Sequence, residues 1–276
     1  MSEGRLKQSH SPPGRSLAFT IAAAILLVAL LGTAVPVLTG DIPLAKRRST
    51  YEQMSAETRA MQDEDTANPA MLWVLDGEAL WRAKAGAARR ACSDCHGDAP
   101  KSMKGVAARY PAYDAKRSTP VDLEERINIC RTEQQQAPAL AFEGKDLLAL
   151  TAYIARQSRG MLIESSDARL EPFIAAGRAM FEGRQGQLNL ACSHCHDDNW
   201  GQKLAGIAVP QGHPTGYPLY RLEWQTLGSL QRRLRNCLIG MRAESYPYGA
   251  PEYVALETFL MWRARGMPME SPAVRP

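Results

Sequence analysis

Two short motifs of cysteine and histidine stand one hundred positions apart and could do metal chemistry. Two residues between paired thiols let one helical turn carry both sulfurs along a porphyrin edge, while the next imidazole ligates the iron. A lone C-x-x-C also suits a redox dithiol or half of a zinc site, but the histidine that follows both copies favours haem. The motifs predict two covalently bound haem c groups. The predicted attachment and proximal ligand residues are Cys92, Cys95, His96, Cys192, Cys195 and His196.

The chain has six cysteines, and the two outside these motifs are Cys130 and Cys237. They follow the two motifs at similar spacing, before a helical segment, where a cytochrome c domain supplies its sixth iron ligand. Histidine is too scarce elsewhere in the chain to fill both positions. We therefore predict His96 with Cys130, and His196 with Cys237, as the axial ligands of the two irons.

Two other arrangements of these residues are open. Cys130 and Cys237 could form a disulfide in an oxidising compartment. Alternatively, Met161 and Met267, which follow the last helical segment of each half, could ligate the irons while the two cysteines are buried as apolar side chains.

The motifs lie in a repeat, which sets the domain organisation. In each half an apolar helical segment precedes the C-x-x-C-H motif, and a loop-rich wrap, a lone cysteine, a second helical segment and a Gly-Met pair follow it. We predict a mainly α fold with two tandem cytochrome c-like domains over 69–165 and 166–276. Residues 41–68 are polar without an apolar stripe, and are predicted to form an N-terminal extension that wraps the domains.

The first 40 residues have the pattern of an export segment. Met1–Arg15 is polar and basic, and Leu17–Thr39 is an uncharged apolar run. This predicts a signal peptide or membrane anchor over 1–40, with cleavage favoured, and the basic flank disfavours a buried core helix. Either version exports the rest of the chain to the periplasm, as covalent haem attachment requires.

Composition and charge indicate which classes of partner the protein can have. The chain has 276 residues, 45% of them hydrophobic and 22% charged, and a formal net charge of +4, which is an ordinary globular balance. No basic run with interleaved aromatic residues occurs, so we expect no nucleic-acid partner.

Several longer strings carry a family resemblance. Residues 41–276 resemble the SoxA family, the dihaem cytochrome c subunits of the SoxAX complex of bacterial thiosulfate oxidation. The strings that carry the resemblance are Asp65-Thr-Ala-Asn-Pro, Trp73-Val-Leu-Asp-Gly-Glu-Ala-Leu-Trp, Gly105-Val-Ala-Ala-Arg-Tyr-Pro, Gly186-Gln-Leu-Asn-Leu-Ala-Cys, Gly216-Tyr-Pro-Leu-Tyr-Arg-Leu-Glu-Trp-Gln-Thr-Leu-Gly-Ser-Leu and Tyr246-Pro-Tyr-Gly. Some members lack the first haem, but this chain keeps its Cys92, Cys95 and His96 and so resembles the dihaem branch.

The resemblance implies an activity and roles for particular residues. It implies an L-cysteine S-thiosulfotransferase that oxidatively couples thiosulfate to a cysteine of a SoxYZ-like carrier and passes two electrons through haem. Cys130 and Cys237 match the distal iron ligands, and Cys237 matches a cysteine that the family modifies to a persulfide in the active site. Arg233 and Arg263 match the basic residues of the substrate channel. Implied partners are a SoxX-like monohaem cytochrome c, the SoxYZ-like carrier, thiosulfate and a downstream cytochrome c acceptor.

Charge near the two lone cysteines agrees with a reactive Cys237. A small dianion needs fixed positive charge, which guanidinium groups supply. Arg232, Arg233, Arg235 and Arg242 lie close to Cys237 in sequence, whereas the approach to Cys130 is less basic. The main alternative is a dihaem electron carrier of the cytochrome c4 kind, in which a methionine would be expected to ligate the iron in each domain. A dihaem peroxidase is a third hypothesis, and would need a labile sixth iron position with acid–base residues nearby.

Overall fold

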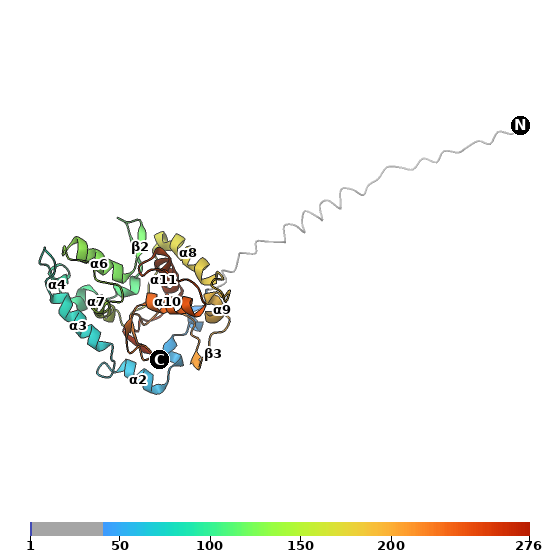
Figure 1. The fold of residues 1–276 in the computed structure, drawn as a ribbon, viewed down its shortest axis with the longest axis horizontal. Helices are drawn as coiled ribbons and strands as arrows, with labels where there is room; N and C mark the ends of the chain where they lie inside the picture. The colour runs from blue at the N-terminus through green and yellow to red at the C-terminus, as the bar shows by residue number, and fades with distance from the viewer. Residues whose placement is uncertain (2–40) are drawn as a thin grey trace. The chain divides into compact units, whose positions relative to one another are not determined.

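A computed structural model describes Met1 and residues 41–276, which are mainly helical, as predicted (Figure 1). The predicted export segment falls on residues 2–40, outside the described residues. Within the described part of the chain, no helix is long and apolar enough to span a bilayer.

The described elements form two consecutive sets, preceded by an extension, and both sets contain a long helix, the motif helix, a hairpin, a cysteine-bearing helix and a last long helix in that order. The extension holds η1 (Leu44–Lys46), η2 (Thr50–Gln53) and α2 (Ala56–Asp63). The first set is α3 (Met71–Arg82), α4 (Cys92–His96), α5 (Ala99–Ser102), η3 (Ala107–Arg109), β1 (Ala112–Asp114), β2 (Thr119–Val121), α6 (Leu123–Glu133) and α7 (Lys145–Arg156). The second set is η4 (Ala168–Leu170), α8 (Glu171–Glu182), α9 (Cys192–His196), β3 (Lys203–Leu204), β4 (Ile207–Ala208), β5 (Leu219–Arg221), β6 (Thr226–Gly228), α10 (Leu230–Gly240) and α11 (Pro251–Arg263), followed by β7 (Ala273–Arg275).

Each repeat is held by a close crossing of its first and last long helices. In the first repeat α3 packs on α7, and in the second α8 packs on α11. Both crossings occur at a glycine: a Cβ on Gly77 would lie 2.1 Å from the carbonyl oxygen of Ala149, and one on Gly177 would lie 2.1 Å from that of Ala255. The helix backbones therefore touch directly, which no larger residue allows.

A hairpin followed by a helix carries the lone cysteine in each repeat. The antiparallel pair β1–β2 leads into α6, whose first turn is capped by Asp122, and β5–β6 leads into α10, capped by Ser229. Cys130 and Cys237 are each the eighth residue of their helix. The shared geometry places the two thiols equivalently in the two repeats.

The repeated Gly-Met pairs join the two repeats to each other. Gly160 and Gly266 both have φ of +80°, the left-handed conformation that glycine tolerates best. The backbone N–H of Met269 donates to the carbonyl of Met161 at 2.8 Å, and that of Ile163 donates to Met267 at 2.9 Å. Met161 and Met267 therefore lie at the contact between the repeats.

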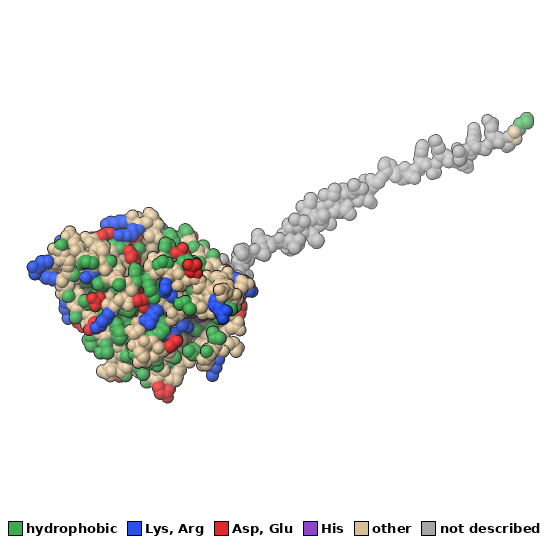
Figure 2. Space-filling model, viewed as in Figure 1, with side chains coloured by type: hydrophobic (Ala, Val, Ile, Leu, Met, Phe, Trp, Pro, Cys, Tyr) green, Lys and Arg blue, Asp and Glu red, His purple; other side chains and the backbone are tan. Residues whose placement is uncertain are grey.

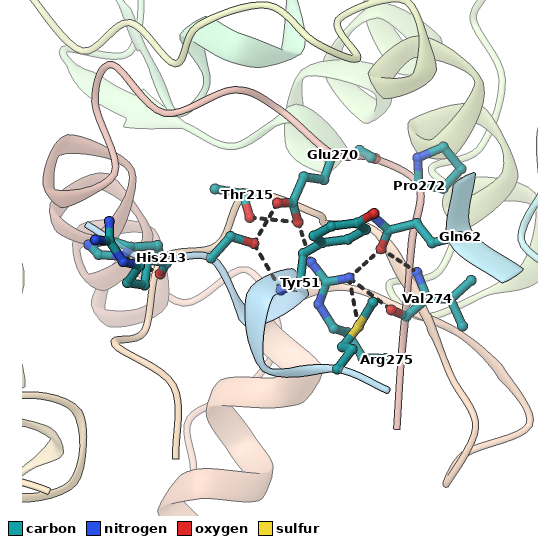
Figure 3. Close-up of polar contacts among 12 residues, drawn as sticks. Tyr51, Gln62, His213, Thr215, Glu270, Pro272, Val274 and Arg275 are labelled. Carbon is teal, nitrogen blue, oxygen red and sulfur yellow. Dashed lines mark hydrogen bonds and ion pairs between the residues drawn. The ribbon is translucent and has the colours of Figure 1, made fainter. Parts of the chain in front are cut away.

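The extension and the C-terminal strand close the second repeat. Strand β7 pairs parallel with β5, and α2 packs against β7. Figure 3 shows the buried Arg275 side chain donating to Gln62 of the extension and to Glu270. Gln62 also accepts from the backbone N–H of Val274 at 3.1 Å. The polar residues of the extension are thus used to bind the end of the chain.

Carboxyl groups meet in a small cavity of about 60 Å³ between the repeats. Asp122 is 2% exposed and accepts a hydrogen bond from Gln231 Nε2 at 2.8 Å. Burial raises the pKa of Asp122 to about 6. Burial, with the nearby charges of Asp122 and Glu124, also raises the pKa of Glu257 well above its usual range. These carboxyls hold protons more tightly in the folded protein than in the unfolded chain.

Gly77→Ala and Gly177→Ala should each destabilise the protein, because the added methyl group meets the carbonyl of the crossing helix. We expect a loss of about 1–3 kcal/mol in the free energy of unfolding, the usual range for overpacking. Gly240→Ala is the matched control, since Gly240 also lies in a helix but has no atom within 4 Å of its added Cβ. Denaturant unfolding of the haem-loaded protein measures all three, and equal effects in the three variants would contradict the crossing model.

Stability should fall as pH rises from about 4 through the folded-state pKa values of the buried carboxyls. Unfolded carboxyl groups titrate near pH 4, so the stabilisation is complete below that pH and is lost as the folded groups ionise. The raised pKa of Asp122 corresponds to a loss of about 3 kcal/mol. Glu257→Gln should flatten the decline, whereas Asp146→Asn, at an exposed position, should leave it unchanged. Thermal unfolding between pH 4 and 9 tests this, and an unaltered slope in Glu257→Gln would refute it.

Candidate functional site

A cavity of about 330 Å³ in the second repeat brings His196 and Cys237 together. His196 comes from the end of the motif helix α9, and Cys237 from the middle of α10. Leu256 and Leu260 of α11 close one side, and Met54 of the extension closes another. The predicted His196 and Cys237 ligand pair therefore shares one cavity.

The His196 ring is oriented by its surroundings. Its Nδ1 lies 2.7 Å from the carbonyl oxygen of Pro210, which fixes Nδ1 as the protonated nitrogen. Nε2 is then free to ligate a metal. The Phe181 ring lies 6.2 Å from the imidazole, between centroids, so the ring also packs against the apolar core.

Cys237 lies in a strongly polarising environment. Burial acts to raise the pKa of its thiol, but the contact with His196 and the charges of Arg233 and Arg221 outweigh it, and the pKa falls below its ordinary value. For Cys130, burial dominates and the thiol pKa is raised. The two equivalent cysteines thus differ in how readily they become thiolates.

Three arginines line the cavity: Arg221, Arg233 and Arg275. Arg275 is paired with Glu270, as Figure 3 shows, so its charge is neutralised. Among the described residues Arg233 forms no ion pair, and Arg221 pairs only with the largely exposed Glu223.

The other arginines near Cys237 in sequence turn away from it. Arg232 lies over the Trp224 ring, 4.3 Å from its centroid, and 3.8 Å from Glu143. Arg235 lies over the Tyr248 ring and donates to the carbonyl of Tyr246. Arg242 takes part in a turn, where its carbonyl accepts from Gln187. Of this sequence cluster, only Arg233 reaches the cavity.

The structure does not bring Arg263, the predicted second channel residue, to Cys237. Its side chain is fully buried on α11, is paired with Asp197 and lies over the Phe181 ring, 5.1 Å from its centroid. Asp197 directly follows His196, so Arg263 holds the loop on the imidazole side of the cavity. The residues lining the cavity do not include it.

The first repeat presents its motif more openly. His96 is exposed and lies 5.7 Å from the Trp81 ring, whose Nε1 donates to Gly97 at 3.0 Å. The thiol group of Cys130 interacts electrostatically with the thiol groups of Cys92 and Cys95, so Cys130 lies close to both. All six cysteines are free, which leaves the alternative Cys130–Cys237 disulfide without support.

Sequence reasoning missed three contributors to the cavity: Arg221, Arg275 and the extension. Arg275 lies far from the motif in sequence, and no local pattern marked it. Arg221 could have been found from the sequence repeat. It lies in the hairpin before α10, and a matching hairpin precedes α6 in the first repeat. Comparing the two hairpins position by position would have singled it out.

The fold and the two motifs define a tandem c-type cytochrome. A family model described as the SoxA/TsdA cytochrome c domain matches residues 76–163 and again 176–269. The matches cover both repeats and confirm the predicted fold class, and covalently bound haem c is the cofactor of such domains.

Individual relatives identify the family more closely. The chain is 36% identical to the L-cysteine S-thiosulfotransferase subunit SoxA of Pseudaminobacter salicylatoxidans, over 85% of this chain and 87% of that protein. It is 34% identical to the subunit of the same name from Rhodovulum sulfidophilum, over 83% and 80%. A crystal structure of SoxXA from P. pantotrophus matches with a TM-score of 0.80 and 30% identity, over 83% of this chain and 87% of that one. The chain belongs to the SoxA family.

Arg263→Met should destabilise the second repeat without weakening binding of a substrate anion, because Arg263 holds Asp197 and not the cavity. Removing the buried guanidinium breaks its ion pair with the partly exposed Asp197 and should cost about 1–3 kcal/mol, less than the loss of one partner from a fully buried pair. Thermal unfolding measures this loss, and the Kd of the cavity for sulfate, a small inert dianion, should stay within about twofold of the wild-type value. A large rise in that Kd with unchanged stability would place Arg263 in the anion-binding part of the cavity after all.

Proposed function

We propose that this chain is the dihaem subunit of an L-cysteine S-thiosulfotransferase, which couples thiosulfate oxidatively to a cysteine of a SoxYZ-like carrier. The single observation that carries the proposal is the meeting of Cys237 with His196 in a cavity that Arg233 also lines, where Arg233 has no acidic partner among residues 41–276. The relatives that bear this activity in their names match most of the chain.

The residues present fit one haem c group in each repeat. Cys192 and Cys195 would hold the second group covalently, His196 and Cys237 would ligate its iron, and the fixed tautomer of His196 suits that role. Cys92, Cys95, His96 and Cys130 form the equivalent set in the first repeat. Haem c supplies a one-electron acceptor when bound.

The proposed reaction balances with an external electron acceptor. The terminal sulfur of thiosulfate forms a bond to the thiol sulfur of the carrier cysteine, giving an S-thiosulfonate. The thiol loses one proton, and two electrons leave in single-electron steps to a downstream cytochrome c. No bond within thiosulfate breaks, so the reaction is an oxidative coupling.

In this scheme the residues of the cavity bind thiosulfate and orient it toward the reactive sulfur. Arg233 offers its guanidinium to the sulfonate oxygens of thiosulfate, and Cys237 presents its sulfur beside the bound anion. We propose Cys237 in persulfide form as the catalytic sulfur. Leu230, Leu234 and Leu256 give the cavity apolar walls, which strengthen the attraction between the guanidinium and the anion.

The proposal includes location and partners. A SoxX-like monohaem cytochrome c would be the heterodimer partner, consistent with the SoxXA assembly named for the structural relative. The SoxYZ-like carrier and the downstream cytochrome c acceptor would meet the protein in the periplasm, after export directed by residues 1–40. The electron-carrier alternative has less support, because Met161 and Met267 lie at the contact between repeats.

Cys237→Ala should keep both covalent haems and lose thiosulfate-dependent activity, because the variant lacks the reactive sulfur but keeps both C-x-x-C-H motifs. Intact mass under non-reducing conditions counts the haems, and turnover is measured with carrier, partner cytochrome and cytochrome c present. Asn236→Ala changes the exposed neighbour on the same helix and should remain active. Activity retained in Cys237→Ala would rule out the mechanism.

A further inference from the structure

The two repeats can be superposed position by position from the hairpin to the cysteine. Strands β1 and β2 and helix α6 correspond to β5, β6 and α10 at a constant offset of 107 residues, with equal lengths throughout. Asp114 pairs with Thr119 at the place where Arg221 pairs with Thr226. The same offset carries Cys130 onto Cys237. Differences at matched positions therefore show how the two cysteine sites have diverged.

In the first repeat, the arginine one helical turn before the cysteine is neutralised. Arg126 lies four residues before Cys130, and its guanidinium is 2.7 Å from the carboxylate of Asp114. Asp114 is 5% exposed and also lies 3.4 Å from Arg117. The first site thus has an acid at the hairpin position that faces its arginine.

In the second repeat, the acid at that position is replaced by an arginine. Arg233 corresponds to Arg126, and Arg221 corresponds to Asp114, so two guanidinium groups stand where the first repeat has an ion pair. Trp224 takes the place of Arg117, and its ring supports Arg221 at 5.3 Å from the ring centroid. Both Arg221 and Arg233 line the cavity that contains Cys237.

The charge of this arginine pair is poorly compensated within the described residues. Arg221 is 7% exposed, its Nε has no hydrogen-bond partner, and its one ion-pair partner, Glu223, is 61% exposed. Burial and the neighbouring charge of Arg233 lower the pKa of Arg221, as expected for two cations that line one cavity. Two neighbouring guanidinium groups whose only ion-pair partner among the described residues is the exposed Glu223 repel each other, and a bound dianion would offset both charges.

We propose that Arg221 and Arg233 form a two-guanidinium clamp for the substrate dianion, and that replacing the aspartate of the first repeat by Arg221 makes the second repeat the substrate site. The identity of the dianion as thiosulfate rests on the proposed function. The clamp itself rests on the matched positions and the shared cavity. The first repeat, with its internal ion pair, has no equivalent site for a dianion.

Three variants of the haem-loaded protein, in complex with its partner cytochrome, test the clamp. Arg221→Gln removes one donor, and Arg221→Asp recreates the pairing of the first repeat by placing an acid opposite Arg233. Arg232→Gln is the control, because it removes the same charge from the neighbouring position of α10, outside the cavity.

Binding is measured first with sulfate, an inert dianion, by calorimetry at low ionic strength. Arg221→Gln should weaken sulfate binding roughly 10- to 100-fold, the loss of one charge-assisted contact. Arg221→Asp should abolish binding, and Arg232→Gln should change it less than threefold. Equal weakening in Arg221→Gln and Arg232→Gln would show only a general charge effect and would overturn the proposal.

Turnover separates this proposal from the one on which it rests. In Arg221→Gln the KM for thiosulfate should rise by the same factor as the sulfate affinity falls, with kcat changed less than threefold. Unchanged KM and sulfate binding, with an altered reduction potential of the second haem, would assign Arg221 to the haem and overturn the clamp. If the wild-type protein bound sulfate through Arg221 but did not turn over thiosulfate, the proposed function would fail while the anion clamp stood.

Discussion

Direct contact between helix backbones at two glycines is the constraint on which each repeat depends. Gly77 lies against Ala149, and Gly177 lies against Ala255, so the first and last helices of each repeat cross at the closest possible distance. This crossing fixes the helix that leads into each C-x-x-C-H motif. It thereby fixes where each imidazole faces, and the cysteine-bearing helices α6 and α10 complete the arrangement.

The same scaffold supports two differently charged sites. The hairpin and the helix that carry the lone cysteine match in the two repeats. Burial nevertheless raises the pKa of the Cys130 thiol, whereas nearby positive charge lowers the pKa of the Cys237 thiol. Over the face shown in Figure 2, acidic and basic side chains are interspersed. That face therefore has no single-signed patch that would attract an anion.

Much of this architecture could be predicted from sequence, because the haem motifs have fixed spacing and the repeat is regular. The apolar helical segment expected before the first motif is α3, and His196 and Cys237, which are predicted to ligate one iron, share one cavity. Arg263 shows the limit: a basic residue on the last helix near the site can serve the substrate or a buried carboxylate, and only the fold shows Asp197 beside it. Arg275 lines the cavity because strand β7 pairs with strand β5. That pairing joins segments far apart in sequence, so no local pattern predicts it.

The second cavity depends on contacts between residues that lie far apart in sequence, because the N-terminal extension binds strand β7 at the end of the chain. Gln62 and Arg275 are 213 residues apart, and the wall that they support also includes Met54. The helix crossing of the first repeat needs only residues within one domain. Closing a loop of this length costs more conformational entropy than forming contacts within one repeat, so the reactive cavity depends on contacts that are entropically more costly than the helix crossings. The local free energy of opening at this wall is therefore a property of the whole chain rather than of the domain that contains the cysteine.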